Sequence, residues 1–313
     1  SNYLIFYFAH FYKNFGMIKV IRILAVVLLF GSCKAQPGAI HLKTNADNNT
    51  LLWEVSGNKL VAPSYLFGTF HLICKDDIPF GEQFKTAVKS AKEIYMELDM
   101  DDPATMFGGL MLMNMKGDTT LKTLFTEAEY KKIETFFNDS LHTPIGLFKS
   151  MKPFFLMAML YPKMLKCTTM SGVEEEIMKL AKANKKEIKG LETMAFQAAV
   201  FDSIPYTQQA KELLKTIDSL DAYKKYFDTM VKIYKTQQLA AMQNLFTKSE
   251  FGMEDNQDIL LDKRNINWVV QLNTIMKKES VFVAVGAGHL VGEKGLIELL
   301  RKEGYTLRPI ENK

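Results

Sequence analysis

The sequence predicts a mixed α/β fold in which one central sheet is built from both ends of the chain and a large helical insertion caps it. Three observations lead to this prediction. Apolar, β-branched and aromatic runs of strand length occur before about residue 100 and again after residue 280, whereas the region between them, about residues 103–277, has mainly helical periodicity. A chain that begins and ends in strands can bury both sets in one sheet.

The N-terminal strands are expected at Leu51–Val55, Ser64–Phe70 and Ile94–Leu98, with a helix over residues 81–92 between the last two. Strand, helix and strand form a β-α-β unit, which implies a parallel pair joined by a right-handed crossover. The C-terminal end repeats the pattern. Its expected elements are a strand at Val281–Val285, a helix over residues 291–302 and a strand at Tyr305–Ile310.

The middle of the chain is expected to be helical apart from one short strand at Glu187–Leu191. Ser171 and Glu174 have the spacing of a capping box at a helix start. The Met and Phe side chains of this region are expected to form core, with a hydrophobic substrate groove as the alternative. The helices are expected over Met106–Met115, from a cap at Thr126 to Phe137, over Ser150–Leu165, after Ser171, over residues 206–248 with an interruption near Ser219, and over residues 257–277.

The charge balance argues against a nucleic-acid partner. The chain of 313 residues has a formal net charge of +4, with 39 basic and 35 acidic residues. Residues 1–35 contain four basic residues and no acidic one, so the remainder has 39 − 4 = 35 basic and 35 acidic residues. Binding to phosphates needs a basic excess or a clustered basic face.

The N-terminal segment predicts export. Residues 17–22 form a basic start and Ile23–Phe30 form an apolar run, which is too short to span a bilayer. Gly31-Ser32-Cys33 is similar to a lipobox, so Cys33 would carry a lipid anchor in the cell envelope, periplasmic or on the outer membrane; the alternative is cleavage near Ala35 and secretion. Residues 1–16 are interpreted as upstream translated sequence, 36–50 as a tether and 51–313 as a single domain. The lipid anchor is the one membrane contact that we expect.

Export also bears on the cysteines. If Cys33 belongs to the signal segment, Cys74 and Cys167 remain as an even pair. Exported proteins form disulfides, so this pair predicts a Cys74–Cys167 bridge between the segment after His71 and the helical middle. Two free buried thiols are the alternative.

Two short glycine–histidine motifs follow predicted strands at opposite ends of the chain, Gly68-Thr69-Phe70-His71 and Gly286-Ala287-Gly288-His289. Open α/β sheets bind ligands at the carboxyl ends of their strands. The second motif also resembles a dinucleotide-binding turn, but its third glycine, Gly292, falls one place late for that pattern. Both histidines are therefore expected at the functional edge of the sheet.

Histidine and carboxylate ligands together suit Zn, Fe, Mn or Co. The expected metal ligands are His71, His289 and Glu97, which lies at the end of another predicted strand, and a bound water completes an open catalytic site. Gly68, Gly286 and Gly288 are expected to shape the backbone through positive φ and close approach. Structural, hydrogen-bonded histidines are the alternative.

Two further residues are candidates for catalysis. Glu192 could be a second carboxylate that serves as base or ligand, or it could cap the helix that follows. Arg264 could stabilise an oxyanion or pair with Glu97. Each of these roles has a structural alternative, a helix cap for Glu192 and an ion pair for Arg264.

The order of these motifs resembles the TraB/PrgY/GumN superfamily, to which the animal Tiki metalloproteases belong, over about residues 50–313, and is most similar to its bacterial GumN-like branch. The segments that carry the resemblance are the two glycine–histidine motifs, Glu97-Leu98-Asp99, Leu191-Glu192-Thr193 with Gln197, and Arg264-Asn265. The resemblance implies an exported metal-dependent hydrolase that cleaves peptides or proteins, with Mn or Co as metal. A non-catalytic envelope binding or signalling protein and a haem- or iron-binding protein are the alternatives. Oligomeric state does not follow from the sequence.

Overall fold

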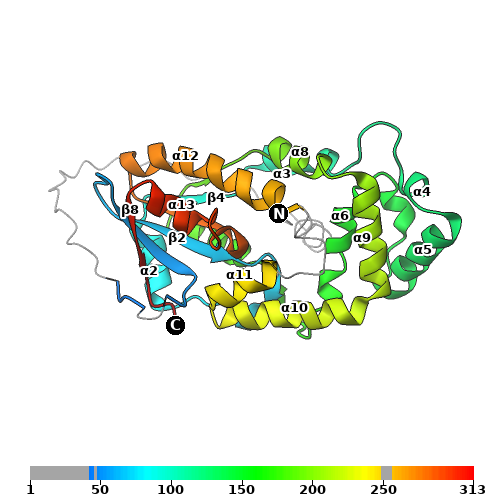
Figure 1. Ribbon diagram of the computed structural model, residues 1–313, viewed down its shortest axis with the longest axis horizontal. Helices are drawn as coiled ribbons and strands as arrows, with labels where there is room; N and C mark the ends of the chain where they lie inside the picture. The colour runs from blue at the N-terminus through cyan, green and yellow to red at the C-terminus, as the bar shows by residue number, and fades with distance from the viewer. Residues whose placement is uncertain (1–41, 46–47, 248–255) are drawn as a thin grey trace, which may run out of the picture.

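The computed structural model describes residues 42–45, 48–247 and 256–313. A mixed sheet of six strands forms one half of the molecule (Figure 1). The strand order is β6-β4-β7-β2-β1-β8, so strands from both ends of the chain share one sheet, as predicted. The strands are β1 (Leu52–Gly57), β2 (Ser64–Thr69), β4 (Glu93–Met96), β6 (Ile188–Gly190), β7 (Val281–Gly286) and β8 (Tyr305–Pro309).

The three central strands run in the same direction and end at the same edge. β2 pairs parallel with β7, with Thr69 opposite Gly286, and β4 pairs parallel with the other side of β7, with Met96 opposite Ala284. β1 is antiparallel to both β2 and β8. Residues that follow β2, β4 and β7 are therefore brought together, although they are far apart in the sequence.

The predicted adjacency within each β-α-β unit is wrong. β7 lies between β2 and β4, and β2 and β1 lie between β7 and β8. β7 is buried on both faces from Val281 to Val285, and such a continuous apolar strand is stable at the centre of a sheet. The intervening helices are α2 (Glu82–Ser90) and α13 (Leu296–Lys302).

Helices cover the sheet. Phe84 of α2 packs its ring 4.6 Å from the ring of Phe67 and 5.3 Å from that of Phe282. α12 (Lys263–Lys278) packs on α13, and a π-helical turn, η5 (Asp258–Asp262), leads into α12. α7 (Val173–Ala183) contacts α2.

The rest of the helical middle forms a cap beside the sheet. In Figure 1, α4, α5, α6 and α9 gather at the end of the molecule opposite the sheet, and α10 and α12 run lengthwise along its two margins. Contacts between α6 and α9, between α3 and α8, and between α5 and α9 hold the cap together. These helices are α3 (Pro103–Leu112), α4 (Leu121–Leu124), α5 (Glu127–Leu141), α6 (Pro153–Ala158), α8 (Met194–Asp202), α9 (Tyr206–Asp218), α10 (Leu220–Lys235) and α11 (Leu239–Thr247).

Several predicted helix boundaries differ from the structure; α3, for example, spans Pro103–Leu112 instead of Met106–Met115, and α5 continues past Phe137 to Leu141. The helix expected over Ser150–Leu165 is only α6, followed by a 3₁₀ turn at Tyr161–Lys163, because Pro162 cannot continue an α-helix. α13 starts at Leu296 because Gly292 has a φ of +91°. Ser171 does not cap α7; Gly172 holds that position, and the Ser171 hydroxyl lies 2.9 Å from the carboxylate of Glu176. The capping box at Thr126 is present.

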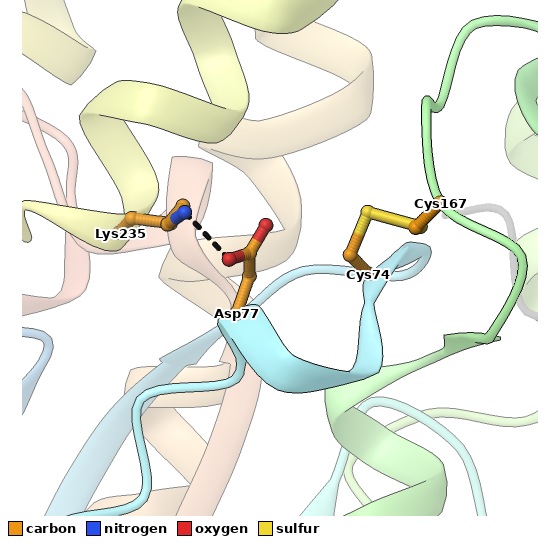
Figure 2. Close-up of a disulfide and its surroundings, with 4 residues drawn as sticks. All are labelled: Cys74, Asp77, Cys167 and Lys235. Atoms are coloured by element: carbon orange, nitrogen blue, oxygen red, sulfur yellow. Dashed lines mark ion pairs between the residues drawn. A yellow bond between two sulfur atoms is a disulfide. The ribbon is translucent and has the colours of Figure 1, made fainter.

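A small two-stranded sheet stands outside the main sheet. β3 (Ile73–Cys74) pairs with β5 (Met170–Ser171), and the Cys74–Cys167 disulfide joins the same two segments (Figure 2). The Nζ of Lys235 on α10 lies 2.5 Å from the carboxylate of Asp77, which adds a second link nearby.

At the outer edge of the main sheet, Thr44 bridges to Ile310, so part of the segment before β1 packs along the sheet. Within the ranges described above, no helix is long and apolar enough to cross a bilayer.

Candidate functional site

The structure brings the three predicted metal ligands to one place at the edge of the sheet. A Cβ atom built on Gly286 would lie 3.3 Å from Oε1 of Glu97, 3.6 Å from Cδ2 of His289 and 3.9 Å from Cε1 of His71. The three side chains come from the ends of β4, β7 and β2, which are parallel neighbours. Their convergence follows directly from the strand order.

His289 is buried and tightly held. Its Nδ1 lies 2.6 Å from Oδ1 of Asn265, whose Nδ2 donates to the carbonyl groups of His289 and Lys294. This orientation of the amide makes Nδ1 the donor, so Nε2 carries the lone pair. Nη1 of Arg264 approaches that Nε2 at 3.3 Å, and the Trp268 ring lies 4.5 Å from the imidazole centre. Burial lowers the pKa of His289 well below 6.5, so the ring is neutral at pH 7.

His71 is held by a carboxylate. Its Nδ1 lies 2.8 Å from Oε1 of Glu174, and the two side chains are 20% and 4% exposed. A carboxylate accepts, so Nδ1 donates, and in the neutral ring the lone pair is on Nε2. Burial raises the pKa of Glu174, but the charge and hydrogen bond of His71 outweigh it, and the pKa lies below its ordinary value. Glu174 is therefore an anionic support for the first histidine.

Glu97, Arg264 and Glu192 form a buried charge network. Glu97 accepts the Gly286 N–H at 2.9 Å through Oε1 and Nη2 of Arg264 at 2.6 Å through Oε2. Burial disfavours ionisation of Glu97, but the charge of Arg264 holds its pKa well below the usual range. Glu192 receives Nη2 of the same arginine at 2.5 Å and Nε1 of Trp268 at 3.1 Å. Burial is the largest influence on Glu192 and raises its pKa.

The structure places the two additional catalytic candidates differently. Arg264 lines the cavity above the site together with Glu97, whereas Glu192 does not line it and binds Arg264 from behind. The cap of the following helix is Thr193, whose hydroxyl accepts the Phe196 N–H. Glu192 is therefore not the helix cap, and Arg264 makes the ion pair with Glu97 that the sequence suggested.

The expected positive φ of the motif glycines is wrong. Gly68, Gly286 and Gly288 are absent from the glycines with positive φ in the described part of the chain. Close approach explains two of them. A Cβ on Gly68 would come within 2.8 Å of Leu290 and 3.0 Å of Ala287, and a Cβ on Gly286 would press on Glu97. Gly68 therefore leaves room for the second histidine turn and Gly286 leaves room for Glu97, and neither provides an unusual backbone conformation.

Sequence reasoning missed two residues of the site. Glu174 was interpreted as part of a capping box, and its contact with His71 spans 103 positions of the chain. Trp268 lies one helical turn after Arg264, within 4.8 Å of its guanidinium carbon, and had no local pattern that marked it. A glutamate at the third position after a short strand was the available signal for Glu174.

The donor set fits a divalent metal by its chemistry. Histidines that bind metals donate their other ring nitrogen to an oxygen acceptor, as both histidines do here. Oε1 of Glu97 lies 3.7 Å from Nε2 of His289, near the roughly 3.4 Å that separates two ligands of a tetrahedral zinc ion. Across the described ranges, however, no three side chains of His, Cys, Asp or Glu lie close enough together to hold a metal ion as they are now placed. The guanidinium of Arg264 lies between Glu97 and His289.

A cavity of ≈ 260 Å³ opens above this edge of the sheet. His71, Glu97, Arg264 and His289 line it, together with apolar side chains of the helical cap. A ligand in the cavity would therefore contact the two histidines directly. Three predicted features of the N-terminus lie outside the described residues, namely the upstream segment 1–16, the signal segment 17–35 and Cys33 within it.

Fold and site together define an α/β protein with a histidine–carboxylate centre under a helical cap. The chain belongs to the TraB/PrgY/gumN family, whose model matches residues 51–309. No solved structure matches it.

Named relatives agree with this membership. The chain is 22% identical to "Metalloprotease TIKI homolog" of Amphimedon queenslandica over 92% of this chain and 67% of that protein. It is 23% identical to "Metalloprotease TIKI2" of Danio rerio, over 83% of this chain and 61% of the relative. "Uncharacterized protein YbaP" of Shigella flexneri is 24% identical over 76% of this chain and 88% of its own length. The chain thus spans about two thirds or less of the two metalloproteases.

Proposed function

We propose that the protein is a metal-dependent hydrolase that cleaves peptide bonds. The observation that carries this proposal is the matched arrangement of two histidines beside the ionised Glu97, in which each Nδ1 is held by an oxygen, so that in the neutral ring the lone pair is on Nε2. Neutral imidazoles and a carboxylate are the forms that bind a divalent cation. The names of the Tiki relatives support peptides as substrates.

In this proposal His71, His289 and Glu97 hold Mn, Co, Zn or Fe. When bound, such a metal would polarise a carbonyl group and lower the pKa of water, which supplies hydroxide as the nucleophile. Glu97 stays ionised because the guanidinium of Arg264 binds one of its carboxylate oxygens, while the other accepts the Gly286 N–H. Arg264 also lines the cavity and can stabilise negative charge that develops on a substrate oxygen. Glu192 binds Arg264 from behind the cavity and fixes it in this position, so its proposed part in catalysis is to orient Arg264.

The proposal includes the cell envelope as location. The Cys74–Cys167 disulfide of the structure fits an oxidising compartment. Residues 17–35 would direct export, with Cys33 as the lipid-anchored residue, and residues 51–313 would form one catalytic domain.

A non-catalytic binding protein of the same fold is the second candidate. The position of Arg264 favours it, because a guanidinium that binds both Glu97 and His289 Nε2 fills the electrostatic role of a cation at the site. In that case the network would be structural and the cavity would serve recognition alone.

Metal content separates the two candidates. Protein that begins at Gln36 is purified and its bound metal is measured by mass spectrometry, beside the His71→Ala/His289→Ala double variant and a His142→Asn control. The proposal predicts about one metal ion per chain in the wild type and control, as for a single catalytic site, and none in the double variant. Hydrolysis of a peptide library should stop on chelation and return with the metal. Protein that stays metal-free after reconstitution would favour the binding protein, and a Soret band would indicate haem.

A further inference from the structure

The cavity above the site has polar residues on the side of the sheet and mostly apolar residues on the side of the helical cap. Its polar floor is formed by His71, Glu97, Arg264 and His289. The walls come from the helical cap and are mostly apolar; they include Phe154, Met157, Phe201, Phe227, Met230 and Leu261. Among the lining residues that the structure describes, charge is confined to the floor. A charged ligand side chain against these walls would lose its hydration without gaining a partner.

The apolar walls are connected to the first histidine motif. Phe70, which directly precedes His71, packs its ring 5.8 Å from that of Phe227, and Phe227 lies 5.6 Å from Tyr161. Tyr234 of α10 donates a 2.9 Å hydrogen bond to the carbonyl of Gly68. The helix that supplies Phe227 and Met230 is thus fixed relative to His71, so the wall and the site keep a constant relation.

The composition of the walls indicates what they accept. Aromatic rings favour aromatic and other bulky apolar groups, and the flexible methionines adapt to different shapes. The cavity lies near the lower end of the roughly 300–1,000 Å³ typical of ligand pockets, which suits one or two side chains. The side chains of Thr216, Tyr223 and Tyr226 also line the cavity. A peptide group can hydrogen-bond to the polar floor while its apolar side chain lies against the walls.

We propose that the helical cap is a specificity pocket for a peptide that carries a bulky apolar side chain next to the bond held at His71 and His289. This inference rests on the proposed peptide hydrolysis for its ligand class. It assigns the Met- and Phe-rich cap a role in substrate selection, in addition to its contribution to the core.

Binding without turnover tests the pocket. A series of hexapeptides that differ at one position, with Phe, Leu, Met, Ser, Asp or Lys, is titrated by calorimetry into the full-length protein in the presence of a chelator. Peptides with Phe, Leu or Met should bind at least about tenfold more tightly than those with Ser, Asp or Lys, as is usual for one bulky group in an apolar pocket. Dodecanoate is titrated in parallel as a probe for acyl chains.

Two matched variants locate the binding. Met230→Glu places a charge in the wall and should weaken binding of the Phe peptide about tenfold or more. Met111→Glu makes the same change on α3, where the side chain is 76% exposed, and should leave binding unchanged. If thermal melting shows that Met230→Glu does not fold, Met230→Gln gives the same comparison without the charge.

The outcomes separate the pocket from the reaction. Equal affinity for all six peptides, equal weakening by both methionine variants, or dodecanoate as the tighter ligand would overturn the inference. If apolar peptides bind selectively but are never cut with any metal, the pocket stands and the proposed hydrolase fails. If peptides are cut with no preference at the varied position, the hydrolase stands and the pocket fails.

Discussion

The two glycine–histidine turns have the same place in the sheet and different surroundings. Both follow parallel, adjacent strands, β2 and β7. His71 is 20% exposed and bound to the carboxylate of Glu174, whereas His289 is 3% exposed, bound to the amide of Asn265 and packed against Trp268. The first turn is thus the more exposed half of the site and holds its histidine with a carboxylate, whereas the second is the enclosed half and holds its histidine with a neutral amide.

The difference lies in what fixes each imidazole. The first turn is tied to the cap by the disulfide between Cys74 and Cys167 (Figure 2). The second depends on side chains of α12, namely Arg264, Asn265 and Trp268. A similar sequence motif therefore does not imply a similar environment. The following predictions test this division between a covalently tied half and a half held by a charge network.

Removal of Arg264 should have the largest effect. Arg264→Met leaves Glu97 and Glu192 buried without their shared cation, and such losses cost about 3–5 kcal/mol. Urea unfolding in the presence of a chelator measures the change. Arg264→Lys should not restore stability, because one ammonium group cannot reproduce the forked contacts to both carboxylates.

Arg301→Met is the control for this prediction. Arg301 pairs with Glu298 on the surface, with side chains 40% and 45% exposed, and its guanidinium carbon lies 5.5 Å from the centre of the Trp53 ring. Its loss should change stability by no more than about 1 kcal/mol. Equal losses for Arg264→Met and Arg301→Met would mean that the network around Arg264 is not essential to the second turn.

Loss of the disulfide should affect the first turn selectively. The bridge joins residues 93 positions apart, and Cys74→Ser/Cys167→Ser should lower the free energy of unfolding by about 2–5 kcal/mol. Hydrogen exchange should quicken at residues 71–75 and 168–174 and stay unchanged at 286–290. A reductant should have no effect on the double variant. Faster exchange at both turns would remove the proposed division.

The supports of the histidines should contribute to metal affinity. Loss of such a support typically weakens binding 10–100-fold, and Glu174→Gln should fall in this range because His71 loses a charged acceptor. Glu175→Gln, at the next position of α7, is the control, since Glu175 pairs with Lys179 instead. Affinity is measured by competition with a zinc chelator. Identical affinities for the two variants would exclude a role of the carboxylate in metal binding.

The sequence was sufficient for the elements of the sheet but not for their order. Apolar runs such as Val281–Val285 are local patterns, and they identified the strands. The insertion of β7 between β2 and β4 depends on pairing between segments almost 200 residues apart, which no local pattern records. Helix ends that depend on Pro162 or Gly292 were visible in the sequence, but their effect was underestimated.

The site was predictable where it follows strand ends. His71, Glu97 and His289 were expected together because they come after strands, and parallel strands end at one edge. Glu174 was missed because its position after Ser171 fits a capping box equally well. Its actual partner lies on another element, so only the folded structure distinguishes the two interpretations.

The smallest predicted effect concerns the protonation of the enclosed half. Burial lowers the pKa of His289 in the folded protein, while the unfolded chain keeps the ordinary value of about 6.5. As the pH falls below that value, His289 binds a proton in the unfolded state but stays neutral in the folded state. The free energy of unfolding should therefore decrease, by up to about 1.4 kcal/mol per pH unit for this one group.

Urea unfolding from pH 7 to 5, with a chelator present so that metal binding adds no pH dependence, measures this slope. His289→Gln cannot take up the proton, so its stability should fall less steeply than that of the wild type, whatever its stability at pH 7. His142→Asn, which changes a histidine on the cap, should keep the wild-type slope. Glu97 does not obscure the comparison, because its lowered pKa confines its contribution to lower pH. Parallel curves for wild type and His289→Gln would show that the enclosed half admits the charge, which would contradict the prediction.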